Sequence, residues 1–127
     1  MSTTGGLDLP NILSSAKRVV LLNALPLNAI SIAVDAKIYP TDTNSVLNAL
    51  KDLKVPLSCY IGHPATTMLL MKHGINITCT RGNYTYSNGD MLIAFVLKTR
   101  PSTSGADVNV VNIDDLLSYV IVLSPLT

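Results

Sequence analysis

Apolar and polar positions alternate along the chain in patterns that predict several β-strands. Residues 18–25, RVVLLNAL, form an almost unbroken apolar run, which is typical of a strand buried on both faces. In residues 30–39, ISIAVDAKIY, apolar side chains occupy every second position, which predicts a strand with one buried face. Shorter segments also have strand-like composition: 56–61, 75–79, 91–97 and 119–124. Strands are therefore expected from one end of the chain to the other.

Helical periodicity lies between these strands. One apolar stripe follows Thr41 or Asp42, either of which can cap a helix, and it consists of Val46, Leu47, Leu50 and Leu53. A second helix is predicted from Pro64 to about residue 73, where Gly74 ends it. A short helix is expected near residues 113–117.

Turn residues complete the predicted framework. The pair Asn88–Gly89 is typical of a hairpin turn, and Gly82 is expected at a bulge. Interleaved strands, helices and hairpins predict a single α/β domain with a mixed β-sheet flanked by short helices. The 127 residues fit one domain. Residues 1–16 are rich in Ser, Thr and Gly and are expected to form a flexible arm, leaving 17–127 as the domain.

Composition narrows the possible functions. Charged residues make up 13% of the chain and the net charge is +1, which argues against binding duplex nucleic acid by electrostatics alone. The N-terminus has no basic segment followed by an apolar core, and the apolar window 19–34 is too short and polar to span a bilayer. We therefore expect a cytoplasmic protein in which Cys59 and Cys79 are reduced core thiols. The histidines lack the usual spacing of zinc ligands, and no metal site is expected.

The segment YIGHPATTMLL, residues 60–70, places a histidine at the start of the second helix. A helix N-terminus offers unpaired N–H groups and the positive end of the dipole, which suit a phosphate. Gly62 lets a ligand approach, Thr66 and Thr67 add hydroxyls, and His63 could protonate a departing 5′-oxygen. The alternative is that His63 is a polar cap satisfied by a backbone carbonyl, and the local sequence alone favours this alternative.

Four other polar residues follow predicted strands, where ligands of α/β sheets usually bind. Asn23 and Asn28 bracket ALPL, while Arg81 and Arg100 adjoin loops and have the donor geometry that suits phosphate. The alternative roles are turn formation for the asparagines and solvated loop charge for the arginines. His73 is best explained as a partner of the dipole at the C-terminus of the second helix.

Three blocks in this order, VVLLNALPLNAIS, IGHPATTMLL and NGDMLIAFVLKTR, resemble the viral anti-CRISPR ring nucleases of type III immunity, the DUF1874 family, which has viral and cellular members. The resemblance covers about residues 18–124. It implies a homodimer that binds cyclic tetra-adenylate and cuts it to linear di-adenylate with 2′,3′-cyclic phosphate ends. The implied reaction uses no metal or other cofactor. If the source is viral, the implied location is the host cell cytoplasm.

The resemblance also implies roles for particular residues. His63 matches the general acid, residues 101–107 match a lid, and the ligand-binding positions match Asn23, Asn28, Thr66, Arg81 and Arg100. The family's glutamate after the lid arginine falls near Thr103 here, and the chain contains no glutamate. Ala65 stands where the family commonly has serine or threonine. Two other functions therefore stay open: a non-catalytic or very slow binder of the messenger, and an interaction protein that keeps only the fold.

Overall fold

Five strands form one mixed sheet in the computed structural model, which describes residues 9–62, 64–97 and 116–126. The strands are β1 (Arg18–Leu22), β2 (Val34–Thr41), β3 (Leu57–Cys59), β4 (Asp90–Leu97) and β5 (Leu116–Pro125), in the order β2-β5-β4-β1-β3. β1 runs parallel to both β3 and β4, whereas β5 is antiparallel to β2 and β4. The predicted α/β domain with a mixed sheet is confirmed.

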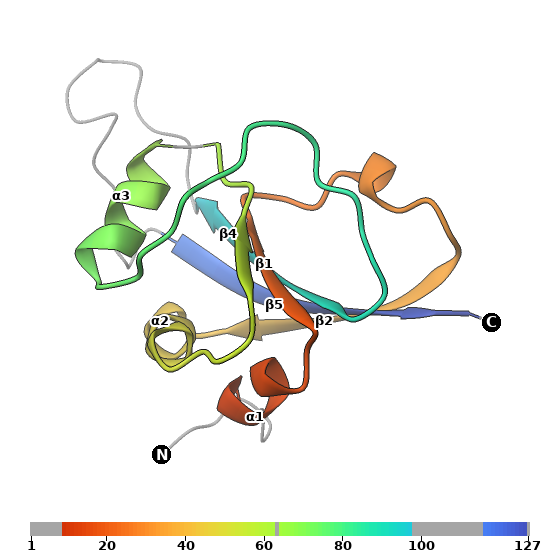
Figure 1. The fold of residues 1–127 in the computed structure, drawn as a ribbon, viewed down its shortest axis with the longest axis horizontal. Helices are drawn as coiled ribbons and strands as arrows, with labels where there is room; N and C mark the ends of the chain where they lie inside the picture. Colours follow the sequence, from red (N-terminus) through yellow and green to blue (C-terminus); the bar gives the residue numbers. More distant parts are fainter. Residues whose placement is uncertain (1–8, 63, 98–115, 127) are drawn as a thin grey trace.

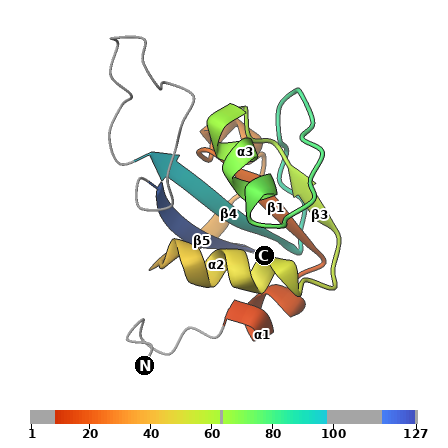
Figure 2. The same cartoon turned by 90° about the vertical axis from the view of Figure 1, so that its left-hand side faces the viewer.

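Three helices cover one face of the sheet: α1 (Leu9–Ser14), α2 (Thr43–Lys51) and α3 (Pro64–Lys72). Figures 1 and 2 both show α1 lying next to α2, and Figure 2 shows α3 nearer to β3. Their apolar side chains pack in one core with inward-facing residues of β1, β4 and β5, among them Leu13, Leu47, Leu70, Val19, Leu21, Ile93, Phe95 and Val120. This core fixes α3 against the end of the sheet that carries β1 and β3.

The other face of the sheet is covered by two loops instead of helices (Figure 1). One loop carries the short 3₁₀ helix η1 (Leu27–Ala29), and the other is the segment 80–88. The Tyr86 N–H donates to the Ala29 carbonyl at 2.8 Å, and the Tyr86 hydroxyl donates to the Leu123 carbonyl at 3.1 Å. Each loop thus holds the other, and Val20 and Leu92 beneath them are fully buried.

The continuous apolar runs behave as predicted. Val19, Val20 and Leu21 of β1 are all 0% exposed, because the helical core and the loop-covered core meet across this central strand. The second run, 91–97, forms most of β4 between β1 and β5. Both were predicted from a continuous apolar run, the pattern typical of a strand with two covered faces.

The predicted starts of both helices and the end of the second are confirmed, whereas α2 ends at Lys51, before Leu53 of the predicted stripe. Of the two candidate caps of α2, Asp42 has the role, since its carboxylate accepts the Ser45 N–H at 3.1 Å. α3 begins at Pro64 and ends at Lys72, and Gly74 follows with φ of 88°, a conformation that favours glycine.

The flexible arm expected over residues 1–16 is wrong for residues 9–14, which form α1. Leu9 and Leu13 are one helical turn apart and bury their side chains in the core, at 6% and 1% exposure. The Ser and Thr content of the N-terminus masked this short amphipathic segment. Residues 1–8 lie outside the described residues.

The half-buried strand expected over residues 30–39 is wrong in its burial. β2 begins only at Val34, Ile32 is 52% exposed before it, and Ile38 is 60% exposed within it. β2 is an edge strand that pairs with β5 alone, and residues 35–40 are all exposed. The alternation of apolar and polar residues therefore predicted the strand correctly but was wrong about a buried face.

The hairpin expected at Asn88–Gly89 is wrong, although the turn itself is present. The Asp90 N–H donates to the Ser87 carbonyl at 3.0 Å, and Gly89 has φ of 97° with Lys17 packed where a Cβ would lie. The segment before the turn pairs with no strand, because β1 and β5 already occupy both edges of β4. The bulge expected at Gly82 and the strand expected over 75–79 are likewise absent from the described residues, apart from a bridge at Cys79. Leu116 and Leu117 belong to β5, not to a helix.

Candidate functional site

The carboxyl ends of β1 and β3 lie side by side, because the two strands are parallel neighbours. This edge of an α/β sheet is where ligands usually bind. Asn23 follows β1, and its side-chain oxygen accepts the backbone N–H of Gly62, which comes after β3, at 3.0 Å. The Asn23 amide also donates to the Phe95 carbonyl of β4 at 3.5 Å. One side chain therefore links the ends of three parallel strands.

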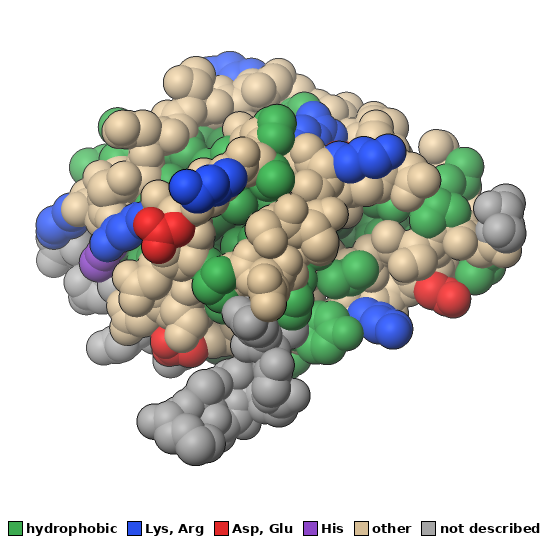
Figure 3. All heavy atoms as spheres, turned by 60° about the horizontal axis from the view of Figure 1, so that its bottom comes forward, with side chains coloured by type: hydrophobic (Ala, Val, Ile, Leu, Met, Phe, Trp, Pro, Cys, Tyr) green, Lys and Arg blue, Asp and Glu red, His purple; other side chains and the backbone are tan. Residues whose placement is uncertain are grey.

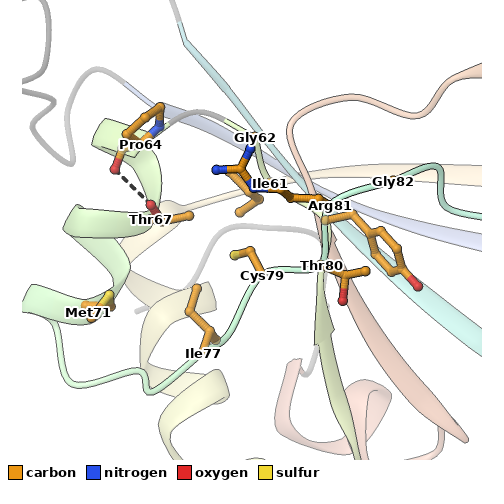
Figure 4. A pocket seen from close by; sticks show the side chains of 11 residues that line it. Ile61, Gly62, Pro64, Thr67, Met71, Ile77, Cys79, Thr80, Arg81 and Gly82 are labelled. Carbon is orange, nitrogen blue, oxygen red and sulfur yellow. Dashed lines mark hydrogen bonds between the residues drawn. The ribbon is translucent and has the colours of Figure 1, made fainter.

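A cavity of about 580 Å³ opens beside this junction. Its walls are the segment 60–62 after β3, one side of α3 from Pro64 through Thr67 to Met71, and the segment 77–82, which runs alongside (Figure 4). Figure 4 shows Arg81 reaching across the cavity toward Gly62, with Thr67 facing it from α3. The volume lies within the range of small-molecule sites, and a cation beside a helix N-terminus favours an anionic group.

A disulfide between Cys59 and Cys79 ties two of these walls together. The expected reduced thiols are therefore wrong: Cys59 and Cys79 form a parallel β-bridge that brings their Cα atoms to 4.5 Å. The expectation of reduced thiols rested on a cytoplasmic location, and it contained no information on the contact between these two residues, which are 20 positions apart. The Thr80 N–H also donates to the Cys59 carbonyl at 2.7 Å. A cross-link over a loop of this length stabilises the folded chain by about 3 kcal/mol, and it fixes Arg81 relative to the segment after β3.

A buried ionic network anchors the remainder of the same loop. Arg18 donates two hydrogen bonds to the Asp90 carboxylate, at 2.6 and 3.1 Å, and the Tyr84 hydroxyl donates a third at 2.6 Å. The Asp90 side chain is only 4% exposed. The Arg18 guanidinium also lies 5.7 Å from the centre of the Tyr84 ring, which packs against Tyr60 of the cavity wall. The segment that carries Arg81 is thus held at both ends.

The network shifts the titration of its members. Burial disfavours the charged form of Asp90, but the hydrogen bonds from Arg18, Tyr84 and the Ser87 N–H outweigh burial and hold its pKa below the usual value. Burial and the hydrogen bond to Asp90 raise the pKa of the Tyr84 hydroxyl. Asp90 is therefore a structural carboxylate that stays ionised.

The structure brings together only part of the predicted site. Arg81 lines the cavity and Asn23 lies at its edge, while Asn28 is exposed on η1, outside the lining residues. Thr66 is 0% exposed and turns into the protein, so that Thr67 is the threonine that lines the cavity. The Thr67 hydroxyl donates to the Pro64 carbonyl at 2.8 Å. Other predicted site positions lie outside the described residues: His63, Arg100, Thr103 and the segment 101–107.

The Thr66 hydroxyl has no hydrogen-bond partner within the described part of the chain. A buried hydroxyl without a partner costs free energy, and valine has nearly the same shape without the polar atom. We expect Thr66→Val to keep or raise the melting temperature and to leave ligand binding unchanged. Thermal denaturation and a binding titration check this, with Thr67→Val as the comparison. A loss of affinity confined to Thr66→Val would restore Thr66 as a ligand-binding residue.

Several residues of the site are not marked by any local sequence pattern. The apolar cavity walls, Tyr60, Met71 and Ile77, lie in segments whose neighbours are set by tertiary packing. The Arg18–Asp90 pair could have been found, because each residue directly precedes a buried apolar run and the two runs pair in parallel register. Among the described residues, no group of three metal-binding side chains lies close enough to hold an ion. None of the described helices is long and apolar enough to cross a membrane.

Comparison with known proteins shows that this chain has a fold similar to that of a solved structure. No family model matches the chain, and no curated protein matches it by sequence. Among solved structures, the chain is similar to B116 of Sulfolobus turreted icosahedral virus, with a TM-score of 0.62 over 82% of this chain and 97% of that one. The sequence identity is 18%, so the likeness is one of fold. The α/β fold of this chain is therefore shared with a protein of a Sulfolobus virus.

Proposed function

We propose that the protein is a ring nuclease, which binds cyclic tetra-adenylate and cleaves it to linear di-adenylate with 2′,3′-cyclic phosphate ends, switching off type III CRISPR signalling. The observation that carries the proposal is the cavity at the start of α3, where Arg81 faces Gly62, the residue before His63. The choice of cyclic tetra-adenylate as the ligand comes from the resemblance of the three sequence blocks to the ring nuclease family. The viral source of the similar structure is consistent with an anti-CRISPR role in a host cytoplasm.

The binding part of the proposal rests on complementary chemistry. A phosphodiester carries one negative charge, which Arg81 and the N–H groups at the N-terminus of α3 can share. The apolar parts of Tyr60, Ile77 and Met71 line the same cavity and suit an adenine base. On the face seen in Figure 3, basic, acidic and apolar side chains are interspersed rather than gathered in a basic band. This pattern suits a small anion better than a long duplex.

The proposed reaction is a transesterification, in which the phosphorus exchanges its bond to the 5′-oxygen for a bond to the 2′-oxygen. The ribose 2′-oxygen forms a bond to the adjacent phosphorus and loses its proton to water, while the bond between phosphorus and the 5′-oxygen breaks. His63 gives its proton to the departing 5′-oxygen, so the leaving group departs as an alcohol. Holding the 2′-oxygen in line with the scissile bond supplies a large part of the acceleration.

Two copies of the chain are proposed to act on one ring. A ring of four identical nucleotides can lie on a two-fold axis, so that each subunit presents the same groups to opposite phosphates. Two cuts of this kind yield two di-adenylate molecules.

The second candidate function is a non-catalytic or very slow binder that sequesters the messenger. It is favoured by one specific observation: the chain contains no glutamate, and Thr103 stands near the place of the family's carboxylate. A binder and an enzyme share the same cavity and differ only in product formation.

Binding is tested with Arg81→Ala. Removing a charged donor from a phosphate is expected to weaken binding of cyclic tetra-adenylate about 10- to 100-fold, as measured by calorimetric titration. Lys37→Ala is the matched control, since Lys37 is an exposed cation on β2, at the sheet edge opposite β3. Equal affinity of Arg81→Ala and wild type would remove Arg81 from the site. Failure of wild-type protein to bind the ring would reject both candidate functions.

A further inference from the structure

We infer that Asn23 is a positioning residue. Its side chain holds the backbone of Gly62 as a clamp and thereby fixes the point from which the chain continues to His63 and α3. The inference rests on the proposed function for its catalytic consequence. It differs from the ligand-binding role that the sequence resemblance gave to Asn23. The hydrogen bonds of the side chain carry it.

The Asn23 side chain continues the hydrogen-bond ladder between β1 and the segment after β3, in place of the backbone carbonyl of residue 23. A regular bond between β1 and the chain after β3 runs from the Tyr60 N–H to the Leu21 carbonyl, at 2.9 Å. In a continued parallel ladder, the Gly62 N–H would next donate to the backbone carbonyl of residue 23. It donates instead to the Asn23 side-chain oxygen, at 3.0 Å. The side chain therefore takes the place of a strand partner at the point where the two segments separate.

Asparagine suits this place because it presents an acceptor and a donor on one short side chain. Its oxygen meets the Gly62 N–H, and its amide nitrogen faces the Phe95 carbonyl of β4 at 3.5 Å. Aspartate would keep the first contact and place a second acceptor against the carbonyl. Alanine would lose both contacts.

Gly62 has open space where a side chain would begin. A Cβ built on Gly62 would meet no atom of the described residues within 4 Å, and the φ of Gly62 lies outside the left-handed region, so neither these neighbours nor the backbone conformation demands glycine. Gly62 also lines the cavity. The clamp thus acts on a residue of the cavity wall whose N–H is held by Asn23. Displacement of this residue would move the histidine that follows it in the chain.

The test compares Asn23→Ala and Asn23→Asp with wild type, using Asn48→Ala, an exposed position of α2, as the control. The readouts are hydrogen exchange of the Gly62 amide without ligand, affinity for cyclic tetra-adenylate, and the single-turnover rate of cleavage. In Asn23→Ala we expect Gly62 exchange to rise about tenfold and cleavage to fall about 100-fold, with affinity changed less than about threefold. Asn23→Asp, which keeps the acceptor, is expected to restore the protection of Gly62.

Two results would overturn the inference. Unchanged Gly62 exchange in Asn23→Ala would show that the clamp does not hold the backbone. A loss of affinity as large as the loss of cleavage would make Asn23 a ring contact. If wild type neither binds nor cleaves the ring, the proposed function fails and the catalytic consequence falls with it, while the exchange measurement still decides whether the clamp exists. Should Asn23→Ala fail to fold, Asn23→Asp decides: exchange faster than in wild type would contradict the clamp.

Discussion

Replacing His63 by alanine is expected to slow cleavage of cyclic tetra-adenylate by about 100- to 10,000-fold, the range that a positioned general acid contributes. The 5′-oxygen would otherwise leave as an unprotonated alkoxide, a poor leaving group. Affinity for the ring should change little, because Arg81 and the N–H groups of α3 are retained. His63 is thus expected to affect the chemical step far more than binding.

The measurement is a single-turnover cleavage time course, with a titration of the same variant for binding. His73→Ala is the matched control: it removes the chain's other histidine, which follows α3 and whose backbone N–H still donates to the Leu69 carbonyl. It should cleave the ring within about twofold of wild type. Equal rates for His63→Ala and His73→Ala would leave His63 as a polar cap with no part in the reaction.

The second large effect is on stability and concerns the buried network below the cavity. Asp90→Ala is expected to lower the free energy of unfolding by about 1–3 kcal/mol, the cost of leaving a buried donor without its acceptor, because Tyr84 is buried whereas Arg18 is 29% exposed and can be hydrated. Arg18 and Tyr84 would lose their acceptor, and the Tyr84 ring would lose its place beside Tyr60. The cavity wall should loosen with it, so ring affinity is expected to fall as well.

The stability difference should depend on pH in a defined direction. The folded-state pKa of Asp90 is held below its unfolded value, so its contribution is fully present above about pH 4. It is lost as the pH falls through the lower folded-state pKa. Urea denaturation of wild type and Asp90→Ala between pH 7 and pH 2 checks this, with the exposed Asp35→Ala as control. A gap that stays constant down to pH 2, or widens, would contradict the assigned role of Asp90.

Local patterns predicted the elements whose environment is uniform along their length. β1 and β4 are covered on both faces, so an unbroken apolar run identified them. α2 and α3 have end signals written into the sequence, in the Asp42 cap and in Gly74. These features depend on neighbours a few residues away.

Features that depend on distant partners were missed. The Asn88–Gly89 signal predicted a hairpin, but the edges of β4 were already taken by β1 and β5. Alternation in β2 predicted a buried face at an edge of the sheet where Ile38 is exposed. The Cys59–Cys79 disulfide required knowledge that the segment after α3 returns to β3. No local rule supplies these pairings.

The site was predicted in the same divided way. Gly62 and Arg81 were both marked by sequence, and the structure places both at one cavity. Periodicity did not decide between Thr66 and Thr67 at the start of α3, where only packing shows that Thr66 points inward. Asn23 was marked correctly as a residue of the strand end, and its contact with Gly62 indicates a positioning role.

The central claim is cleavage of the ring, and one incubation tests it most directly. Pure wild-type protein is mixed with labelled cyclic tetra-adenylate in EDTA, and the products are separated by chromatography and identified by mass. The account predicts linear di-adenylate with 2′,3′-cyclic phosphate ends. Recovery of the intact ring after prolonged incubation would contradict it: a ring still bound to the protein would identify a messenger-binding protein, and a ring free in solution would leave the protein without a role in this signalling.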